Sequence, residues 1–361
     1  MAAKTWLIVG KPLRAPFRDG STVLVRDLVR AMPSERRLAY LGDPASPLRP
    51  GDDVLAAPPA GYAPGPGDKL RALAALLRRP SAPVHLCFTP GAATARAVAG
   101  LRRLQPRRVF LQSLMSSHGA ERWEPLLRPL DAVVALSQHT ADRLRGAGVP
   151  GEKLHVIHPA VAPAAADPAA AVAARRALLY AGDLDREISA RLVALARALP
   201  GGWTLTIACR PKAEHDAAAR DDLRRDLAGE LAAGRVDLLA EVADMDALLR
   251  RSALQVFAAT HTRRKVDLPL VLLEGLARGV PAAVVEAMPA AELAAIGKAA
   301  GLLPGPLVPA APESFARAVA AACAPATLAA WSEAAAALAA RAFSPTTMAR
   351  RYDALYAALE R

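Results

Sequence analysis

Glu274 has the strongest case for chemistry, because it is the one acid in the otherwise apolar run 270–276. An unpaired carboxylate is costly to bury in an apolar helix. Gly279 and Pro281 follow at the spacing typical of a helix end. We therefore expect a short helix that carries Glu274 for a functional reason.

The residues before this helix combine positive charge with a helix start. Asp267 stands at the position of an N-cap, and Pro269 falls in the first turn, where its missing N–H has no cost. A helix N-terminus presents unpaired N–H groups and a partial positive charge, and Arg263, Arg264 and Lys265 lie beside it. The segment is a candidate anion site, with ordinary loop composition as the alternative for Lys265.

Two more cations, Arg210 and Lys212, follow a predicted strand in the sequence IACRPK. The carboxyl ends of parallel strands form the ligand-binding edge of such sheets. Cations fixed in place can neutralise a diphosphate leaving group without a metal ion. The alternative is that both side chains are solvated charges at a strand end.

The N-terminal half contributes Gly20 and His118. Gly20 lies between the sequence PFRD and a predicted helix, where a flexible backbone lets a substrate approach closely. Ser21 is a candidate N-cap of that helix. His118 lies in a loop after a predicted strand and could contact a substrate, although a lone loop histidine is more often merely exposed.

Strands and helices alternate along the whole chain. The run 5–10 predicts a first strand and 21–32 a helix, and later apolar runs repeat the pattern up to helices at 328–342 and 348–361. This alternation is typical of right-handed βαβ units with a parallel sheet. We therefore expect an α/β protein with two Rossmann-like halves.

Domain boundaries follow from composition. At 361 residues the chain is long for one core, and a Pro/Ala-rich stretch without a core-facing pattern separates the halves. We expect an acceptor domain at 1–163, a linker at 164–175 and a donor domain at 176–345. A last helix at 346–361 is expected to pack back on the N-terminal domain.

The composition indicates a globular protein, with 53% hydrophobic and 22% charged residues and a net charge of +12. The charge reflects either compositional drift or attraction to phosphates, lipid surfaces or nucleic acid. A basic cluster could hold anionic headgroups or be a solvated face; it comprises Arg78, Arg79, Arg102, Arg103, Arg107 and Arg108.

The cysteines, the lengths of the apolar runs and the absence of known motifs exclude several classes of protein. The three cysteines lack pairing or metal spacing, which favours buried thiols in a cytoplasmic protein. No apolar run reaches the roughly 18–20 residues of a membrane span. We expect the N-terminal apolar run to be a first strand, because it is shorter than the h-region of a signal peptide. Zinc spacing, a Ser/His/Asp order and a Walker loop are absent from the sequence.

Several segments together resemble the GT-B glycosyltransferases of the GT4 type. That family has a Glu, seven residues, then a second Glu opening a helix; here Glu274 leads into GLARGVPAAV, and Val266 replaces the first Glu. The sequence at 131–161 is similar to the end of a GT4 N-terminal domain. Gly182-Asp183 stands where the family has Gly-Arg, and Glu187 stands near its usual Lys. A Gly-Asp turn, Cys-Arg-Pro-Lys and Lys-Val-Asp-Leu-Pro-Leu are similar to one GT4-like subgroup.

The resemblance implies a fold, a reaction and a set of roles. The fold is GT-B, with two Rossmann-like domains facing each other across a cleft. The reaction is retaining transfer, of the hexosyltransferase type, from a nucleotide sugar, with no metal and no further cofactor. Its acceptor is a polysaccharide, a lipid-linked sugar or a small molecule. The implied catalytic residues are His118 and Glu274, and the implied donor-binding residues are Gly20, Arg210, Lys212, Lys265, Asp267, Leu268 and Glu274.

Two other functions stay open at this stage. The substitutions at Val266, Asp183 and Glu187 are equally expected in a catalytically degenerate protein that acts as a nucleotide-binding or partner subunit. The net charge alone motivates a nucleic-acid or membrane-surface module, although no known nucleic-acid motif accompanies it. We expect a cytoplasmic protein without nucleic-acid partners, with peripheral association at the inner face of an anionic membrane as an alternative.

Overall fold

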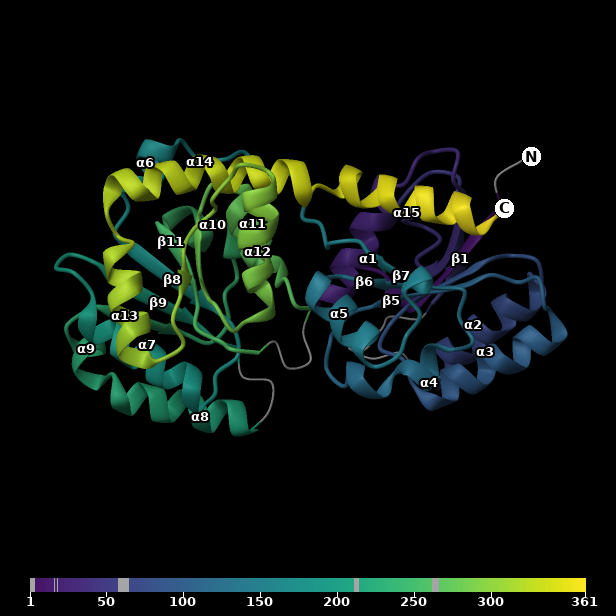
Figure 1. Cartoon of the computed structure of the whole chain (residues 1–361), viewed down its shortest axis with the longest axis horizontal. Coiled ribbons are helices and arrows are strands. Elements are labelled where there is room, and N and C mark those ends of the chain that lie inside the picture. The colour runs from purple at the N-terminus through teal and green to yellow at the C-terminus, as the bar shows by residue number, and fades with distance from the viewer. Residues whose placement is uncertain (1–3, 16, 18, 58–64, 211–213, 262–265) are drawn as a thin grey trace. The chain divides into compact units, whose positions relative to one another are not determined.

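The computed structural model describes all residues except 1–3, 16, 18, 58–64, 211–213 and 262–265. Contacts divide the chain into two compact units (Figure 1). Unit 1 comprises Met1–Ala162, Arg263–Leu268 and Phe343–Arg361, and unit 2 comprises Pro163–Thr262 and Pro269–Ala342. Each unit is a parallel sheet flanked by helices. The expected α/β fold with two Rossmann-like units is confirmed.

In the described part of unit 1, seven parallel strands have the order β3-β2-β1-β4-β5-β6-β7. The apolar runs of the inner strands β2, β4, β5 and β6 are buried on both faces, as is typical of parallel sheets. The predicted first strand is present as β1. The bounds are β1 (Trp6–Leu13), β2 (Leu38–Gly42), β3 (Asp53–Ala56), β4 (Val84–Cys87), β5 (Phe110–Leu114), β6 (Ala132–Ala135) and β7 (Leu154–Val156).

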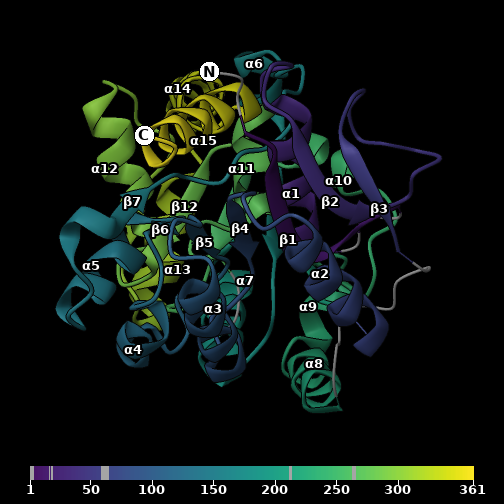
Figure 2. The same cartoon turned by 90° about the vertical axis from the view of Figure 1, so that its right-hand side faces the viewer.

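Helices cover both faces of this sheet. One face packs against α1 and α15, and the other against α2 to α5. Figure 2 shows α15 above β4 and β5 and α3 below them. The bounds are α1 (Gly20–Ala31), α2 (Pro66–Arg78), α3 (Ala92–Leu104), α4 (Glu124–Leu127), α5 (Gln138–Gly146) and α15 (Pro345–Leu359), with short turns η1 (Ala120–Arg122) and η2 (Gly151–Lys153).

The C-terminal helix α15 is fixed to the sheet of unit 1 by a buried polar network. His85 of β4 contacts the Tyr356 hydroxyl through Nδ1 at 2.6 Å and Ser113 Oγ through Nε2 at 2.7 Å. Ser113 Oγ in turn lies 2.8 Å from the Tyr352 hydroxyl. Trp6 stacks on Tyr356 with ring centroids 3.9 Å apart. Every polar group of this cluster therefore has a partner, as burial demands.

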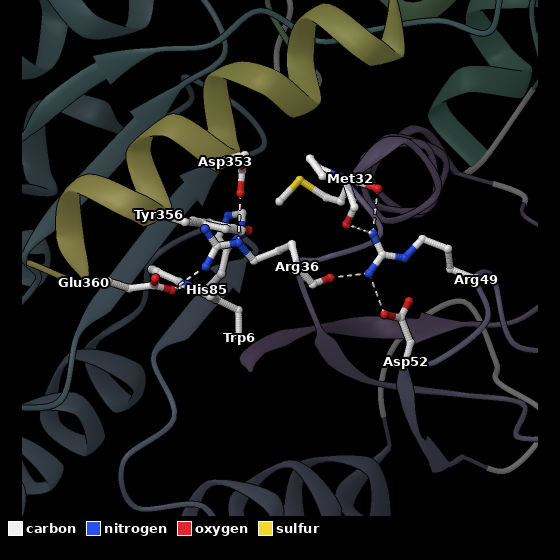
Figure 3. Close-up of polar contacts among 10 residues, drawn as sticks. Trp6, Met32, Arg36, Arg49, Asp52, His85, Asp353, Tyr356 and Glu360 are labelled. Carbon is white, nitrogen blue, oxygen red and sulfur yellow. Dashed lines mark hydrogen bonds and ion pairs between the residues drawn. The ribbon is translucent and has the colours of Figure 1, made fainter. Parts of the chain in front are cut away.

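Charged groups complete the attachment of α15 (Figure 3). Arg36 binds Asp353 through Nε at 2.8 Å and Glu360 through Nη1 at 2.5 Å, and Glu360 also accepts from Trp6 Nε1 at 2.7 Å. On the other side of Arg36, Arg49 donates to the Met32 carbonyl that follows α1. The last helix is thus bound to residues more than three hundred positions away in the sequence.

In the described part of unit 2, six parallel strands have the order β10-β9-β8-β11-β12-β13. Because crossovers are right-handed, the reversal between β8 and β11 puts α7 and α11 on opposite faces. The strand bounds are β8 (Ala177–Ala181), β9 (Thr204–Ala208), β10 (Val236–Leu239), β11 (Leu254–Phe257), β12 (Ala282–Val285) and β13 (Leu307–Val308). The helix bounds are α6 (Ala169–Ala174), α7 (Arg186–Ala198), α8 (Glu214–Asp226), α9 (Ala228–Ala232), α10 (Met245–Arg251), α11 (Leu270–Ala277), α12 (Glu292–Ala299), α13 (Pro312–Ala321) and α14 (Pro325–Ala342), with the turn η3 (Pro289–Ala291).

Part of the stretch expected as a linker is helical. Helix α6 buries Val172 and Ala173 and packs against α14 within unit 2. The sequence did not indicate this helix, because its buried face consists of only Val172 and Ala173 in a Pro/Ala-rich stretch. Among the described helices, none combines the length and hydropathy needed to cross a bilayer.

Candidate functional site

The order of each sheet reverses at one point, and ligands of such folds bind at the carboxyl ends of the strands beside it. In unit 1 this point lies between β1 and β4, and in unit 2 between β8 and β11. The residues that follow these strands are therefore the first candidates in each unit.

In unit 1, the loop after β1 leads into α1 through Asp19. Its Oδ1 accepts hydrogen bonds from the backbone N–H groups of Ser21 and Thr22, both at 3.1 Å. The N-cap is therefore Asp19, and the expectation that Ser21 caps this helix is wrong. Gly20 is the exposed first residue of α1. Its predicted place at a helix start is confirmed, and its donor contact stays a prediction.

Lys11 near the end of β1 accompanies this cap, with Nζ 3.3 Å from Asp19 Oδ1. Burial alone would raise the pKa of Asp19, but the hydrogen bonds from Ser21 and Thr22 and the Lys11 charge outweigh it and lower the pKa. Asp19 is therefore a carboxylate at neutral pH. The sequence analysis missed the pair because it ended the first strand at Gly10, whereas β1 extends to Leu13 and includes Lys11.

His118 lies in the loop after β5, on the same edge of the unit 1 sheet as Gly20. Its side chain is exposed, and its backbone N–H donates to Ser116 Oγ at 3.1 Å. The structure thus leaves the imidazole accessible at the ligand-binding edge. Its catalytic role stays a prediction.

Asp267 has a different position from the one expected. Its carboxylate is 2% exposed and accepts hydrogen bonds from Ser117 Oγ at 2.7 Å, Ser137 Oγ at 2.5 Å and Thr140 Oγ1 at 2.5 Å. All four residues belong to unit 1. Helix α11 has Pro269 at its N-cap position and no side-chain cap. The N-cap interpretation of Asp267 is therefore wrong.

The neighbours of Asp267 are anchored in unit 1 as well. Val266 packs against the apolar cluster beneath α1 and α15, and Leu268 is fully buried. Position 266, where the resemblance expects a Glu, therefore has an apolar packing role. Donor contacts by Asp267 and Leu268 stay predictions; the Asp267 carboxylate already has partners within unit 1, and the Leu268 side chain is buried.

In unit 2, the loops after β8 and β11 are joined by acids. Asp185 caps α7 by accepting from the Ile188 N–H at 2.9 Å, and its Oδ2 lies 3.2 Å from His261 Nε2. Glu187 Oε2 lies 3.4 Å from Thr260 Oγ1. Nothing in the sequence spacing links these loops, so His261 was not anticipated.

The turn after β8 has its shape from a tyrosine beneath it. The Tyr180 hydroxyl donates to the Asp183 carbonyl, and a Cβ at position 182 would lie 2.7 Å from that hydroxyl. Position 182 must therefore be glycine. The Gly-Asp turn is a built feature of this chain, with Asp183 held where the family has an arginine.

Arg191 of α7 fixes the loops of unit 2 from below. Its buried guanidinium donates through Nη1 to the Ala258 carbonyl at 2.9 Å and through Nε to the Ala310 carbonyl at 2.5 Å. Glu187 Oε2 lies 3.4 Å from its Nη2. The Arg191 guanidinium therefore has a structural role, because it holds the loops that contain Ala258 and Ala310.

Glu274 lies half-buried in the middle of α11. The helix is held against β11 by Gln255, whose Nε2 donates to the carbonyls of Leu272 at 3.1 Å and Val280 at 3.3 Å. A Cβ at position 275 would lie 1.9 Å from that nitrogen, which explains Gly275. The predicted helix end is confirmed, because α11 stops at Ala277. A ligand contact by Glu274 stays a prediction.

The remaining predicted cations are only partly placed. Arg210 follows β9 and is exposed, at the ligand-binding edge of the unit 2 sheet. Lys212 and Lys265 lie outside the described residues, as do Arg263 and Arg264. Among the described residues, no cluster of His, Cys, Asp and Glu could hold a metal ion.

Comparisons with known proteins agree with this architecture. Residues 18–165 match the model of the family described as Glycosyltransferase Family 4. No curated protein matches the chain. Anabaena HepE, solved in complex with UDP and glucose, superposes with a TM-score of 0.69 at 16% identity over 98% of this chain and 100% of its own.

Two further solved structures have the same fold. Sucrose-phosphate synthase from Thermosynechococcus elongatus has a TM-score of 0.70 at 16% identity, over 99% of both chains. AviGT4, a glycosyltransferase of avilamycin A biosynthesis, has a TM-score of 0.64 at 21% identity, over 99% of this chain and 98% of its own. At such identities the likeness establishes the fold.

Proposed function

Residues 18–165 belong to Glycosyltransferase Family 4 and the chain as a whole has the GT-B fold, and on this premise we propose that it transfers a sugar from a nucleotide-sugar donor. The observation that carries the proposal is the family match across the sheet of unit 1. The acceptor is a polysaccharide, a lipid-linked sugar or a small molecule. We further propose hexosyl transfer with retention, no metal ion and a cytoplasmic location.

Glu274 is assigned to the donor ribose. Its half-buried place in α11 suits a carboxylate that accepts from two neighbouring hydroxyl groups. The Gln255 contacts and Gly275 hold this helix rigidly against β11, and rigid support favours a fixed binding geometry. His118 and Gly20 are assigned to the transferred sugar and the acceptor.

The donor diphosphate needs cations from outside the loop after β8. That loop has Asp183, and the first turn of α7 has Glu187, where positive charge is expected. The guanidinium of Arg191 donates to backbone carbonyls. We therefore assign the diphosphate to Arg210, Lys212 and Lys265, with the latter two following from the sequence alone. Uridine nucleotides are the first to test, because HepE is solved with UDP and with UDP-glucose.

The test is a calorimetric and thermal-unfolding titration with UDP, GDP, ADP and their sugar conjugates. A ligand at a hundred times its Kd stabilises the folded state by about 2.7 kcal/mol. A true donor should therefore raise the melting temperature, and the increase should grow with the logarithm of the donor concentration. Transfer is then measured with the best donor, with and without a chelator. Activity that a chelator abolishes would overturn the metal-free part of the proposal.

The alternative is a partner subunit with a degenerate donor site. It is favoured by the acids Asp185 and Glu187, which follow β8 and contact the loop after β11, and by the packed Val266. This alternative would be supported if none of the nucleotides bound or raised the melting temperature of a protein that unfolds cooperatively.

A further inference from the structure

Exposed leucines gather on two helices of unit 1. Among the described residues, Leu70, Leu73 and Leu77 of α2 are 67%, 43% and 53% exposed, and Leu104 at the end of α3 is 77% exposed. The spacing of three and four residues puts the α2 leucines in one stripe. Exposed apolar patches of this kind mark binding surfaces more often than isolated surface leucines do.

The stripe is not the side of α2 that holds the helix in place. Ala75 is buried against Leu7 of β1 and Ala39 of β2, and Leu76 packs on the same cluster. At roughly 100° per residue, Ala75 lies on the opposite side of the helix from Leu73 and Leu77, and the partly buried Leu76 lies on the flank between the two sides. Packing within the described part of unit 1 therefore does not account for the outer stripe.

Positive charge is concentrated in the same part of the chain. Residues 66–108 contain nine Lys and Arg but a single acid, Asp68, in a chain whose net charge is +12. Five of these arginines have exposed side chains: Arg71, Arg78, Arg96, Arg103 and Arg107. Nine cations less one acid give the segment 66–108 a net charge of +8, so the charge is not spread evenly along the chain as drift would leave it.

The structure also corrects the basic cluster expected from the sequence. Arg108 is buried and donates to the carbonyls of Leu76 and Ala82, both at 2.9 Å. Arg79 pairs with Asp53, and Arg102 pairs with Asp131. Arg78, Arg103 and Arg107 of that cluster stay exposed.

Arg108 joins the two helices into one surface. Its bond to the Leu76 carbonyl ties the residues that follow α3 to the last turns of α2. Both helices lie on the same face of the sheet, as Figures 1 and 2 show. We call this the α2–α3 surface, defined by Leu70, Leu73, Leu77 and Leu104 with Arg71, Arg78, Arg96, Arg103 and Arg107.

We propose that the α2–α3 surface docks on a membrane leaflet rich in anionic phospholipid. The leucines enter the boundary between headgroups and acyl chains, and the arginines bind lipid phosphates, the division of roles typical of interfacial helices. Nucleic acid fits less well, because single strands are held by stacking on aromatic rings. Phe88 is the only Phe, Tyr or Trp in residues 66–108 and packs partly buried under α3. This inference goes beyond sugar transfer and does not depend on it.

The experiment is cosedimentation of the full chain with vesicles of phosphatidylcholine, with and without about 30 mol % phosphatidylglycerol. Anionic vesicles are expected to bind at least about tenfold more protein than neutral ones, and about 0.5 M salt should weaken that binding. Leu73→Gln with Leu77→Gln, which leaves the charge unchanged, should reduce binding by about tenfold or more. Arg103→Gln with Arg107→Gln should abolish the preference for anionic lipid.

The matched control is Leu303→Gln with Leu307→Gln, two leucines of unit 2 that are 53% and 46% exposed. This control should bind vesicles like the parent, and all variants should keep the parent melting temperature. Nucleotide binding, measured on the same preparations, should be unchanged in every variant. A failure of the proposed sugar transfer is thereby separated from a failure of docking.

Three outcomes would overturn the proposal. Equal sedimentation with neutral and anionic vesicles, or none with either, excludes an anionic leaflet. Tight binding of a single-stranded oligonucleotide that the leucine variants do not weaken, without vesicle binding, would assign the arginines to nucleic acid. A dimer in light scattering that only the Leu73/Leu77 variant converts to a monomer, without vesicle binding, would assign the surface to a second copy of the chain.

Discussion

Asp267 carries the densest set of hydroxyl contacts in the described part of the molecule. Three donors within 2.7 Å converge on one buried carboxylate, and hydrogen bonds to ionised acceptors are stronger than neutral ones. Because the donors come from the loop after β5 and from the start of α5, the carboxylate organises the edge of unit 1 beside His118. We therefore expect the loss of the Asp267 carboxylate to affect the free energy of unfolding more than the catalytic activity.

Replacing Asp267 by Asn should lower the free energy of unfolding by about 1–3 kcal/mol, because the amide offers one acceptor oxygen and turns donors toward hydroxyl groups. Urea unfolding of Asp267→Asn, Ser117→Ala and the double variant forms a thermodynamic cycle. A coupling energy above about 0.5 kcal/mol is expected. Strictly additive effects, together with a raised KM for the donor, would instead favour a ligand contact.

Glu274→Gln should leave stability unchanged and lower kcat/KM by about 10- to 100-fold, the equivalent of one lost bond to a charged acceptor. The measurement is steady-state transfer with the donor found by the nucleotide titration. Glu333→Gln, an exposed glutamate of α14, is the control and should be as active as the parent. Equal activity of both variants would remove Glu274 from the donor site.

The elements themselves were largely predictable, whereas the contacts between distant residues were not. The apolar runs of β1, α1 and α11 and the glycine after α11 are local signals; they place these elements correctly, although β1 extends to Leu13 beyond its predicted end at Gly10. Asp267 looked like an N-cap because its hydroxyl partners lie 127 to 150 residues away. Arg108 looked like a surface charge because its acceptors are backbone carbonyls, which leave no mark in the sequence.

Helix α15 makes the stability of unit 1 depend on pH through His85. Burial lowers the pKa of His85 to about 3, from 6.5 for an exposed histidine. As pH falls below 6.5, the unfolded chain gains a proton that the folded chain does not accept until about pH 3. The neutral, buried His85 thus contributes fully to the free energy of unfolding above pH 6.5, and this contribution is lost as the pH falls toward 3.

His85→Gln should therefore flatten the acid side of the stability profile, by up to about 1.4 kcal/mol per pH unit. Urea unfolding between about pH 4 and 7 measures the slope, which is informative even if the variant is less stable throughout. His139→Gln removes a histidine outside the Tyr352 and Tyr356 network and serves as the comparison. An unchanged slope in His85→Gln would contradict the assignment.

The attachment of α11 to β11 predicts a rescue experiment. Gly275→Ala places a methyl group against Gln255, so it should destabilise the protein by about 3 kcal/mol, the upper range for overpacking. Gln255→Ala removes the obstacle, and the double variant should be more stable than Gly275→Ala alone. Thermal unfolding of the three proteins decides the point. A double variant less stable than either single one would show that the contact is not the cause.

At the scale of the whole molecule, the chain passes from one unit to the other four times, at 162/163, 262/263, 268/269 and 342/343. The N-terminal residues alone therefore do not complete unit 1. It also needs α15 and the short segment Arg263–Leu268. In the sequence, this segment follows the first part of unit 2, and α15 follows all of unit 2. During synthesis, the buried partners of Asp267, His85 and Arg36 become available in stages.

The segment around Asp267 limits how such proteins can recombine. A chimera that receives residues 163–342 from this chain also receives Val266, Asp267 and Leu268, which complete a different unit. A recipient without hydroxyl groups at the positions of Ser117, Ser137 and Thr140 would have to bury an uncompensated carboxylate. We expect such chimeras to melt earlier than the parents and to recover when the three hydroxyls are grafted in. Residues 163–342 can thus be exchanged as a cassette only together with three small residues of the other half.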